Sequence, residues 1–106
     1  MAFNKARALQ EAERSLAQGK VSQAIQQYLQ IIENDPSDLN LINMTGDLCV
    51  RDNSVPEALQ LFRKLAEAYV REGFFLRAIA IYKKILKLDP SGVESMLKLA
   101  ELYTAQ

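Results

Sequence analysis

The sequence predicts an all-α protein built from six antiparallel helices. Only four Gly and three Pro interrupt the 106 residues, and they divide the chain into segments of helical length. Within these segments apolar residues recur every three or four positions, which is the spacing of one helix face. The connections are short, so neighbouring helices are expected to pack antiparallel. The predicted helices cover residues 3–18, 22–34, 38–52, 55–72, 75–88 and 92–104.

The first three helices end at recognisable stop signals. Gly19 follows the first helix, where glycine commonly adopts the left-handed conformation that closes a helix. The dipeptide Asp35-Pro36 ends the second helix, because a proline disfavours helical geometry in the residue before it. The third helix loses its apolar pattern at Asp52-Asn53.

The last three helices carry start signals as well. Ser54 and Glu57 have the spacing of a capping box at the start of the fourth helix, which Gly73 ends. The fifth helix ends at Asp89-Pro90. Ser91 and Glu94 then predict a second capping box at the start of the sixth helix.

The sequence also repeats itself. Gly19, Ala24, Tyr28 and Asp35-Pro36 correspond to Gly73, Ala78, Tyr82 and Asp89-Pro90, with the same spacing in both copies. We call the distance from Gly19 to Gly73 the long period. A small alanine lets two helices approach closely, and an aromatic residue one turn later fills the space beside it. Ala24 and Ala78 are therefore expected to be buried between neighbouring helices.

This pattern resembles the tetratricopeptide repeat, a unit of two helices and about 34 residues. The residues that carry the resemblance are Phe62, Leu65, Ala66, Tyr69, Gly73, Ala78, Tyr82 and Pro90. The resemblance implies an α-α superhelix, with residues 1–106 forming one repeat domain that belongs to a longer array. Because the long period exceeds one such repeat by about one helix, helix 55–72 is interpreted as the second helix of one repeat and the first of the next.

The resemblance implies a scaffold that binds a protein or peptide on the concave face lined by first helices. The candidate groove residues are Asn40, Asn43, Met44, Asp47, Arg51, Gln60, Arg63, Lys64, Glu67 and Arg71. Charged pairs such as Arg63 and Glu67 are four residues apart, so an alternative is that they only solvate an exposed face. The basic clamp for chaperone C-termini is not expected, because Leu9, Glu13 and Met44 stand at its positions.

The sixth helix suggests an alternative function, which is self-association. It is apolar for a helix at the end of a repeat array, where a polar surface is usual. An exposed apolar face generally marks an interface, here with a second copy or a further helix. The candidate residues for a homodimer contact are Met96, Leu99, Leu102 and Tyr103.

Composition argues against an enzyme. The sequence has no His and a single cysteine, Cys49, so it lacks the residues for a serine-type triad, a histidine metal site or an internal disulfide. We expect no catalytic, cofactor-binding or metal-binding residues. No apolar run is long enough to span a bilayer and no export signal is visible, so no membrane contact and a cytoplasmic location are expected.

A remote alternative is binding of an acidic partner or nucleic acid. Thirteen basic residues balance thirteen acidic ones over the chain, but residues 62–88 contain seven basic and two acidic residues. Nucleic-acid sites usually add exposed aromatic platforms, and here Phe62 and Tyr82 are assigned to the core. Nucleic acid is therefore an unlikely partner.

Overall fold

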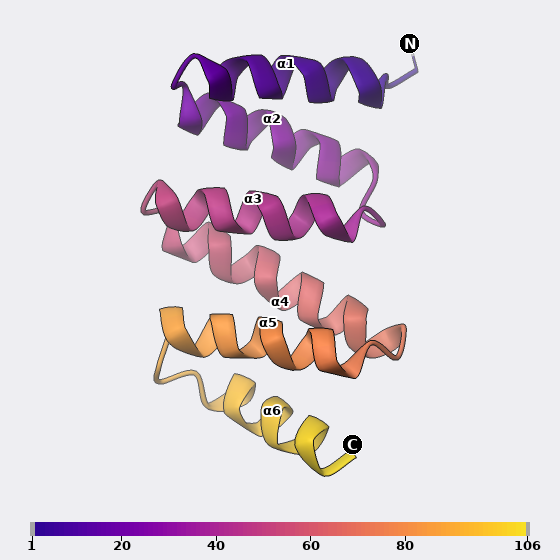
Figure 1. The fold of residues 1–106 in the computed structure, drawn as a ribbon, viewed down its shortest axis with the longest axis vertical. Coiled ribbons are helices and arrows are strands. Elements are labelled where there is room, and N and C mark those ends of the chain that lie inside the picture. Colours follow the sequence, from indigo (N-terminus) through magenta and orange to yellow (C-terminus); the bar gives the residue numbers. More distant parts are fainter. Residues whose placement is uncertain (1, 106) are drawn as a thin grey trace. The chain divides into compact units, whose positions relative to one another are not determined.

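The computed structural model describes residues 2–105, and this part of the chain contains six α-helices and no strand (Figure 1). The all-α prediction is confirmed. The helices begin and end within two residues of the predicted positions. They are α1 (Lys5–Ala17), α2 (Val21–Asn34), α3 (Leu39–Arg51), α4 (Val55–Arg71), α5 (Phe75–Leu88) and α6 (Val93–Ala105).

The chain divides into two compact units of three helices each. Unit 1 ends at Ser54 and unit 2 begins at Val55. In unit 1, α2 packs against α1 and α3, and in unit 2, α5 packs against α4 and α6. The helices α2 and α5 are equal in length, as are α3 and α6, and the members of each pair start one long period apart. The long period found in the sequence therefore corresponds to one complete unit of three helices. That both units form one domain stays a prediction.

The core of each unit uses equivalent residues. Ala24 on α2 and Ala78 on α5 are fully buried, as predicted, and so is the alanine on the preceding helix, Ala12 in unit 1 and Ala66 in unit 2. The small side chains allow the two helices to approach closely. One turn after these alanines Tyr28 and Tyr82 are also buried, and about two turns after them so are Ile31 and Ile85. They fill the space on either side of the alanines.

Three helices end with the same hydrogen-bonded turn. Gly19, Asn53 and Gly73 follow α1, α3 and α4 with positive φ angles of 76°, 59° and 81°. In each turn the next amide donates to a carbonyl five residues earlier: Lys20 to Ser15 at 2.9 Å, Ser54 to Cys49 at 2.8 Å and Phe74 to Tyr69 at 2.8 Å. This arrangement satisfies carbonyls that the helix itself leaves without partners. Asn53 takes the place of glycine because asparagine tolerates this conformation.

The start of α6 differs from the prediction. The first amide-to-carbonyl bond of the helix runs from Met96 to Gly92, so Gly92 is the N-cap and Ser91 is not. The Ser91 hydroxyl donates instead to Asp89 Oδ1 at 3.0 Å, and in unit 1 the Ser37 hydroxyl donates to Asp35 Oδ1 at 2.7 Å. The sequence Asp-Pro-Ser therefore forms the same local turn in both units.

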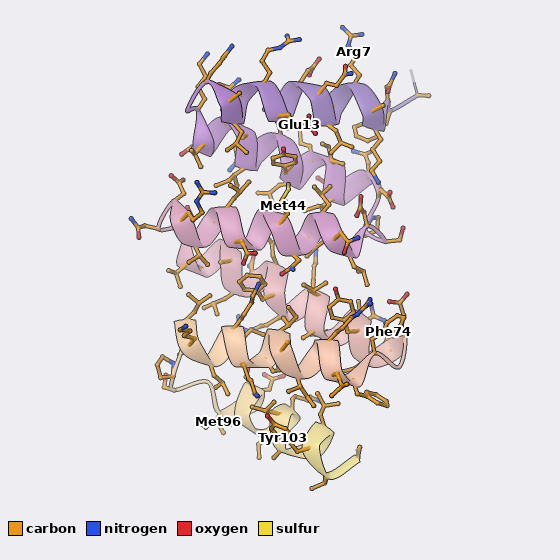
Figure 2. The ribbon with its side chains drawn as sticks, in the orientation of Figure 1. Arg7, Glu13, Met44, Phe74, Met96 and Tyr103 are labelled. Atoms are coloured by element: carbon orange, nitrogen blue, oxygen red, sulfur yellow. The ribbon has the colours of Figure 1, made fainter. Side chains whose placement is uncertain are left out.

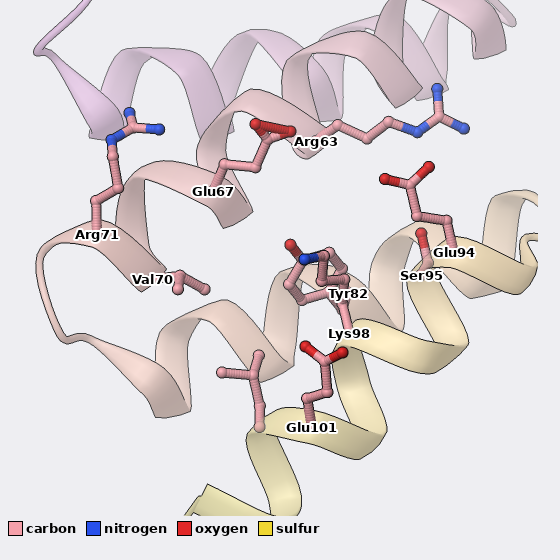
Figure 3. Close-up of a pocket in the computed structure, with 10 residues that line it drawn as sticks. Arg63, Glu67, Val70, Arg71, Tyr82, Glu94, Ser95, Lys98 and Glu101 are labelled. Carbon is pink, nitrogen blue, oxygen red and sulfur yellow. The ribbon is translucent and has the colours of Figure 1, made fainter.

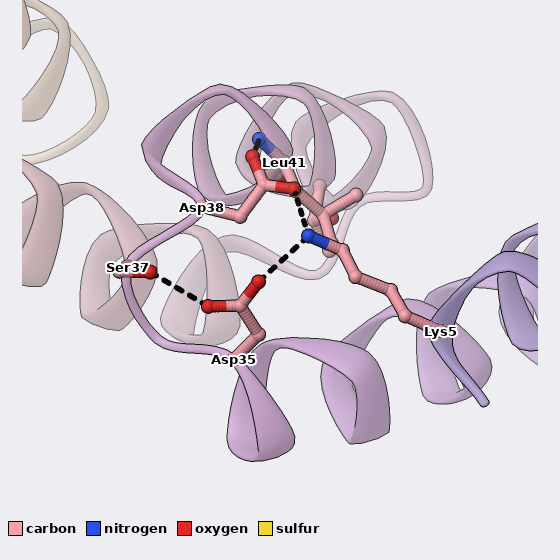
Figure 4. A network of polar contacts seen from close by, with 6 residues as sticks. Lys5, Asp35, Ser37, Asp38 and Leu41 are labelled. Atoms are coloured by element: carbon pink, nitrogen blue, oxygen red, sulfur yellow. Dashed lines mark hydrogen bonds and ion pairs between the residues drawn. The ribbon is translucent and has the colours of Figure 1, made fainter. Parts of the chain in front are cut away.

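A polar cluster beside this turn distinguishes unit 1 from unit 2. Lys5 Nζ lies 2.7 Å from Asp35 Oδ2 and 2.8 Å from Asp38 Oδ2, and so joins the start of α1 to the turn between α2 and α3 (Figure 4). The hydrogen bonds to Asp35 and Asp38 raise the pKa of Lys5. The bonds from Lys5 lower the pKa of both carboxyl groups. Leu59 and Gly92 occupy the equivalent positions of Lys5 and Asp38 in unit 2.

No helix within residues 2–105 combines the length and the apolar character needed to cross a membrane.

Candidate functional site

Unit 2 contains a cleft of about 440 Å³ that opens between α4 and α6, with α5 beneath it (Figure 3). Its walls carry side chains from the facing sides of α4 and α6, and Tyr82 on α5 forms part of its floor. The lining residues are Arg63, Glu67, Val70, Arg71, Tyr82, Glu94, Ser95, Lys98, Glu101 and Leu102.

The α4 wall presents Arg63, Glu67 and Arg71 at intervals of four residues, so all three lie along one helix face. The first and last of these are eight residues apart, which corresponds to about 12 Å along a helix. Arg63 Nη2 lies 3.9 Å from Asp89 Oδ2, a long ion pair that draws this guanidinium toward the end of α5. In Figure 3, Arg63 and Arg71 lie at opposite ends of the cleft.

The α6 wall presents Glu94, Lys98 and Glu101, which are spaced four and three residues apart and share one face. Sequence reasoning missed these three residues, because the sixth helix was interpreted only through its apolar side chains. The signal that could have found them is this spacing, which places a polar face beside the apolar one. Ser95 and Leu102 are buried next to that polar face and complete the wall.

Tyr82 has only 5% of its surface exposed, and that remainder lies on the floor of the cleft. Burial raises the pKa of its hydroxyl, and the carboxylates of Glu67, Glu94 and Glu101 raise it further. The hydroxyl therefore stays protonated at neutral pH and can both donate and accept a hydrogen bond. The sequence prediction that Tyr82 belongs to the core is confirmed, and its position at the cleft adds a role that the pattern did not reveal.

The structure distributes the predicted groove residues over both units. On α3 of unit 1, Asn40, Met44, Asp47 and Arg51 are exposed and Asn43 is half-buried. On α4 of unit 2 all five predicted residues are exposed, but Gln60 and Lys64 do not line the cleft. Only Arg63, Glu67 and Arg71 of the predicted set are brought together there. A groove that uses the α3 residues stays a prediction.

The cations of the cleft are specific to unit 2. The positions one long period before Arg63, Arg71 and Lys98 hold Leu9, Ala17 and Met44. In contrast, the tyrosine and two of the acidic positions are retained, since Tyr28, Glu13 and Asp47 precede Tyr82, Glu67 and Glu101 by the same interval. The two units therefore share the floor and part of the acidic lining, but only unit 2 adds basic groups.

The residues predicted for self-association do not all lie on the surface. Met96 and Tyr103 are exposed (Figure 2). Leu99 is half-buried. Leu102 is only 7% exposed, because it packs inside unit 2 beside the cleft, and its predicted place in an exposed contact is wrong. Sequence reasoning did not include Leu97 among the self-association residues, although its side chain is exposed on α6.

Among residues 2–105, no three His, Cys, Asp or Glu side chains are arranged to hold a metal ion. Cys49 is fully buried in α3, as its place on the inward face predicts. A buried thiol in such surroundings behaves as a small apolar side chain.

The family model of the tetratricopeptide repeat matches residues 3–69 and again 63–106. The chain belongs to the tetratricopeptide repeat family. The two matches share residues 63–69, which lie within α4. This overlap agrees with the interpretation that one helix serves two successive repeats. The positions also fit, because Asn53, Ala58 and Phe62 follow Gly19, Ala24 and Tyr28 by one repeat length of the family.

A solved structure similar to this chain is the first tetratricopeptide-repeat domain of Spaghetti (RPAP3) bound to the HSP90 peptide SRMEEVD. The two are 17% identical, the alignment covers 95% of this chain and 94% of the other, and the TM-score is 0.47. No curated protein matches the sequence.

Proposed function

We propose that this chain is a non-catalytic interaction module that binds a short, extended segment of a partner protein in the cleft of unit 2. The observation that carries the proposal is the convergence of six charged side chains from two helices around the partly apolar floor of one open cleft. Charged residues that only solvate a helix would point into open solvent. Here they line one cleft together with Tyr82, Val70 and Leu102.

The cleft offers the groups that an extended peptide needs. The peptide backbone presents N–H donors and C=O acceptors along its length, which glutamate carboxylates and arginine or lysine cations can bind. The span of about 12 Å between Arg63 and Arg71 accommodates three to four extended residues at about 3.3 Å each. Val70, Leu102 and the Tyr82 ring provide apolar contact for one peptide side chain.

The charges of the cleft favour a segment of mixed character. Three cations and three carboxylates line it, so the cleft has no strong preference for a polyanion or a polycation. Arg71 and Lys98 suit an acidic side chain of the ligand, while Glu67 and Glu101 suit a basic one. We therefore expect the bound segment to contain at least one acidic and one basic residue.

We also propose that the module catalyses no reaction and acts in the cytoplasm. The cleft places carboxylates near a tyrosine, but it adds no activated nucleophile, and the sequence contains no histidine to act as a proton shuttle. Its only cysteine, Cys49, cannot form a disulfide within the chain, which suits a reducing compartment.

The test is a selection of displayed random peptides on the immobilised chain, followed by calorimetric titration of a selected peptide. We expect Arg71→Ala and Glu101→Ala each to weaken binding by about tenfold to a hundredfold, the range for loss of one charged hydrogen bond. Arg51→Ala is the matched control, since Arg51 is an exposed arginine at the end of α3 in unit 1. It should change the affinity by less than twofold.

Two results would overturn the proposal. Selection of no peptide above background would remove the evidence for a peptide-binding module. A selected peptide whose affinity falls with Arg51→Ala or Asp47→Ala, but not with Arg71→Ala, would place the site on α3 of unit 1. Circular dichroism of every variant verifies that the helices are intact.

A further inference from the structure

The outward side of α5 is basic along the helix and apolar at its start. Residues 73–88 contain four basic residues and no acidic one, and Glu72 and Asp89 lie just outside this segment. The helix spacing places six residues on the side opposite Tyr82, and because Tyr82 lines the cleft, this side faces away from it. Lys84 is half-buried and the other five residues are exposed. We call these six the α5 face: Leu76, Arg77, Ala80, Lys83, Lys84 and Lys87.

The exposed cations of the α5 face are not neutralised by carboxylates. Within residues 2–105, none of Arg77, Lys83 and Lys87 forms an ion pair. The Arg77 guanidinium carbon lies 4.9 Å from the centre of the Phe74 ring, and Lys83 Nζ lies 5.6 Å from that of Tyr103. A guanidinium that lies over a ring keeps its in-plane N–H groups for a phosphate oxygen. These cations are therefore available to an anionic partner.

Three consecutive apolar side chains extend the α5 face at the turn between α4 and α5. Phe74, Phe75 and Leu76 are all exposed, Leu76 at 73% of its surface, and we call them the apolar tip. Figure 2 shows Phe74 at this turn. An open hollow of about 330 Å³ lies among the three residues, and Arg77 contributes a charge to its lining. Single exposed apolar residues are common on proteins, but adjacent ones generally mark an interaction site.

The equivalent side of unit 1 remains on the surface even though further helices follow it in the chain. The positions one long period before the α5 face are all on α2: Ser22, Gln23, Gln26, Leu29, Gln30 and Glu33. Leu29 is half-buried there and the other five are exposed. A following helix therefore does not cover this side of a unit. What differs is the chemistry, because unit 1 has one carboxylate and no cation at the six positions, whereas unit 2 has four cations.

We infer that the α5 face binds the surface of an anionic phospholipid bilayer, with the apolar tip inserted at the interface. A basic helix face attracts negatively charged headgroups, and apolar side chains beside it reach the boundary of the acyl chains. Each cation at such a surface strengthens binding by about fivefold. The three exposed cations and the tip together predict half-saturation at on the order of 1 mM accessible lipid.

This contact goes beyond the proposed peptide binding and uses a different side of unit 2. It needs neither a spanning helix nor an export signal, and the absence of these two features was the ground on which the sequence predicted no membrane contact. An anionic surface of this kind faces the cytoplasm, which agrees with the proposed location. The bilayer would hold the α5 face while the cleft on the other side of α5 stays open to its peptide.

The apolar tip favours a bilayer over nucleic acid. Nucleic-acid bases stack on the open faces of aromatic rings. The Phe74 ring has the Arg77 guanidinium over it, and the Tyr69 ring meets it at 90° with the ring centres 6.3 Å apart. Phe74 is therefore already engaged by neighbouring side chains. Leu76, the most exposed residue of the tip, cannot stack on a base but adds apolar area to an inserted tip.

Co-sedimentation with lipid vesicles tests the inference. The chain is mixed with up to about 5 mM lipid, either phosphatidylcholine alone or with about 30% phosphatidylserine. We expect binding only to the vesicles that contain phosphatidylserine, and a marked loss at about 1 M NaCl, where the Debye length is about 3 Å. Lys83→Gln combined with Lys87→Gln should weaken binding about twenty-five-fold. Leu76→Gln, which leaves the charges in place, should weaken it about fivefold.

The matched control removes two exposed cations from unit 1. Arg14→Gln combined with Lys20→Gln changes the net charge by the same amount and should alter vesicle binding by less than about twofold. All five substituted side chains are exposed, so the helices should stay intact in every variant, which circular dichroism verifies.

The inference would be overturned by no binding up to about 5 mM lipid, by equal binding with and without phosphatidylserine, or by an equal loss with the control pair. It would also be overturned by tighter binding to a labelled single-stranded oligonucleotide or to poly-glutamate that Leu76→Gln does not weaken. The peptide selected for the cleft should bind the Lys83→Gln, Lys87→Gln variant with unchanged affinity. Failure of vesicle binding and failure of peptide binding are therefore separate results.

Discussion

Units 1 and 2 share a frame and differ on their surfaces. The paired helix lengths, the glycine turns after α1 and α4, the buried alanines and the Asp-Pro-Ser turns recur after one long period. Several of the differences replace uncharged residues of unit 1 by exposed charged residues of unit 2. For example, Leu9 and Met44 of unit 1 correspond to Arg63 and Lys98 of the cleft. The comparison shows that repetition keeps the turns and the central alanine contacts of each unit, while other positions differ between the units.

The largest expected effect concerns a core position at which the units differ. Phe62 is fully buried on α4, with Lys84 Nζ 5.0 Å above its ring, whereas the equivalent Ala8 on α1 is half-buried. Phe62→Ala should lower the free energy of unfolding by about 3 to 5 kcal/mol. Urea denaturation followed by circular dichroism measures this. Ala8→Gly, which tests the other unit, should cost only about 1 kcal/mol, and a similar cost for both changes would contradict the account.

The next effect should be equal in the two units. Ala24→Leu and Ala78→Leu each insert a large side chain where two helices meet, and each should destabilise the protein by about 1 to 3 kcal/mol. Ala80→Leu is the control, because Ala80 is exposed on α5 and its replacement should change stability by less than about 0.5 kcal/mol. Tolerance of leucine at Ala24 or Ala78 would show that close helix approach is not required there.

A smaller effect tests the turns. No atom lies within 4 Å of the place where a side chain would begin at Gly19 or Gly73, so alanine there meets no steric clash. The positive φ angles of both residues remain unfavourable for alanine, by about 1 to 2 kcal/mol. Gly19→Ala and Gly73→Ala should therefore shift the urea midpoint by similar amounts. Asn53→Gly should be neutral or slightly stabilising, and a large loss would mean that the Asn53 side chain has another role.

The smallest effect is a dependence on pH that belongs to unit 1. The pKa values of Asp35 and Asp38 are lowered by Lys5, so their stabilising contribution is fully present above the unfolded pKa of about 4. It is lost as the pH falls through the lower folded values. Lys5→Met should therefore reduce the loss of thermal stability between about pH 5 and pH 2. Lys20→Met, at an exposed lysine of the same unit, should leave that pH profile unchanged.

The sequence predicted the frame well because local chemistry determines it. Gly19, Gly73 and the two Asp-Pro pairs end helices without help from distant residues, and the burial of Ala24 and Ala78 follows from their spacing. The exception was Ser91, where a turn hydrogen bond to Asp89 replaced the expected helix cap.

The site was only partly predictable. The sequence showed that Arg63, Glu67 and Arg71 share a helix face, but it could not show that Glu94, Lys98 and Glu101 face them across a cleft. That arrangement depends on how α4 and α6 are held by α5, which is a property of packing. For the same reason Leu102, which has the spacing of an exposed flank, proved to be buried.

The most direct test of the account is an NMR titration of the isotopically labelled chain with a selected peptide, at a concentration where the chain is monomeric. The account predicts that amide shifts concentrate in residues 63–71 and 94–102 and at Tyr82, with the amides of α3 unchanged. Shifts that concentrate in residues 40–51 of unit 1, with the cleft unaffected, would contradict it.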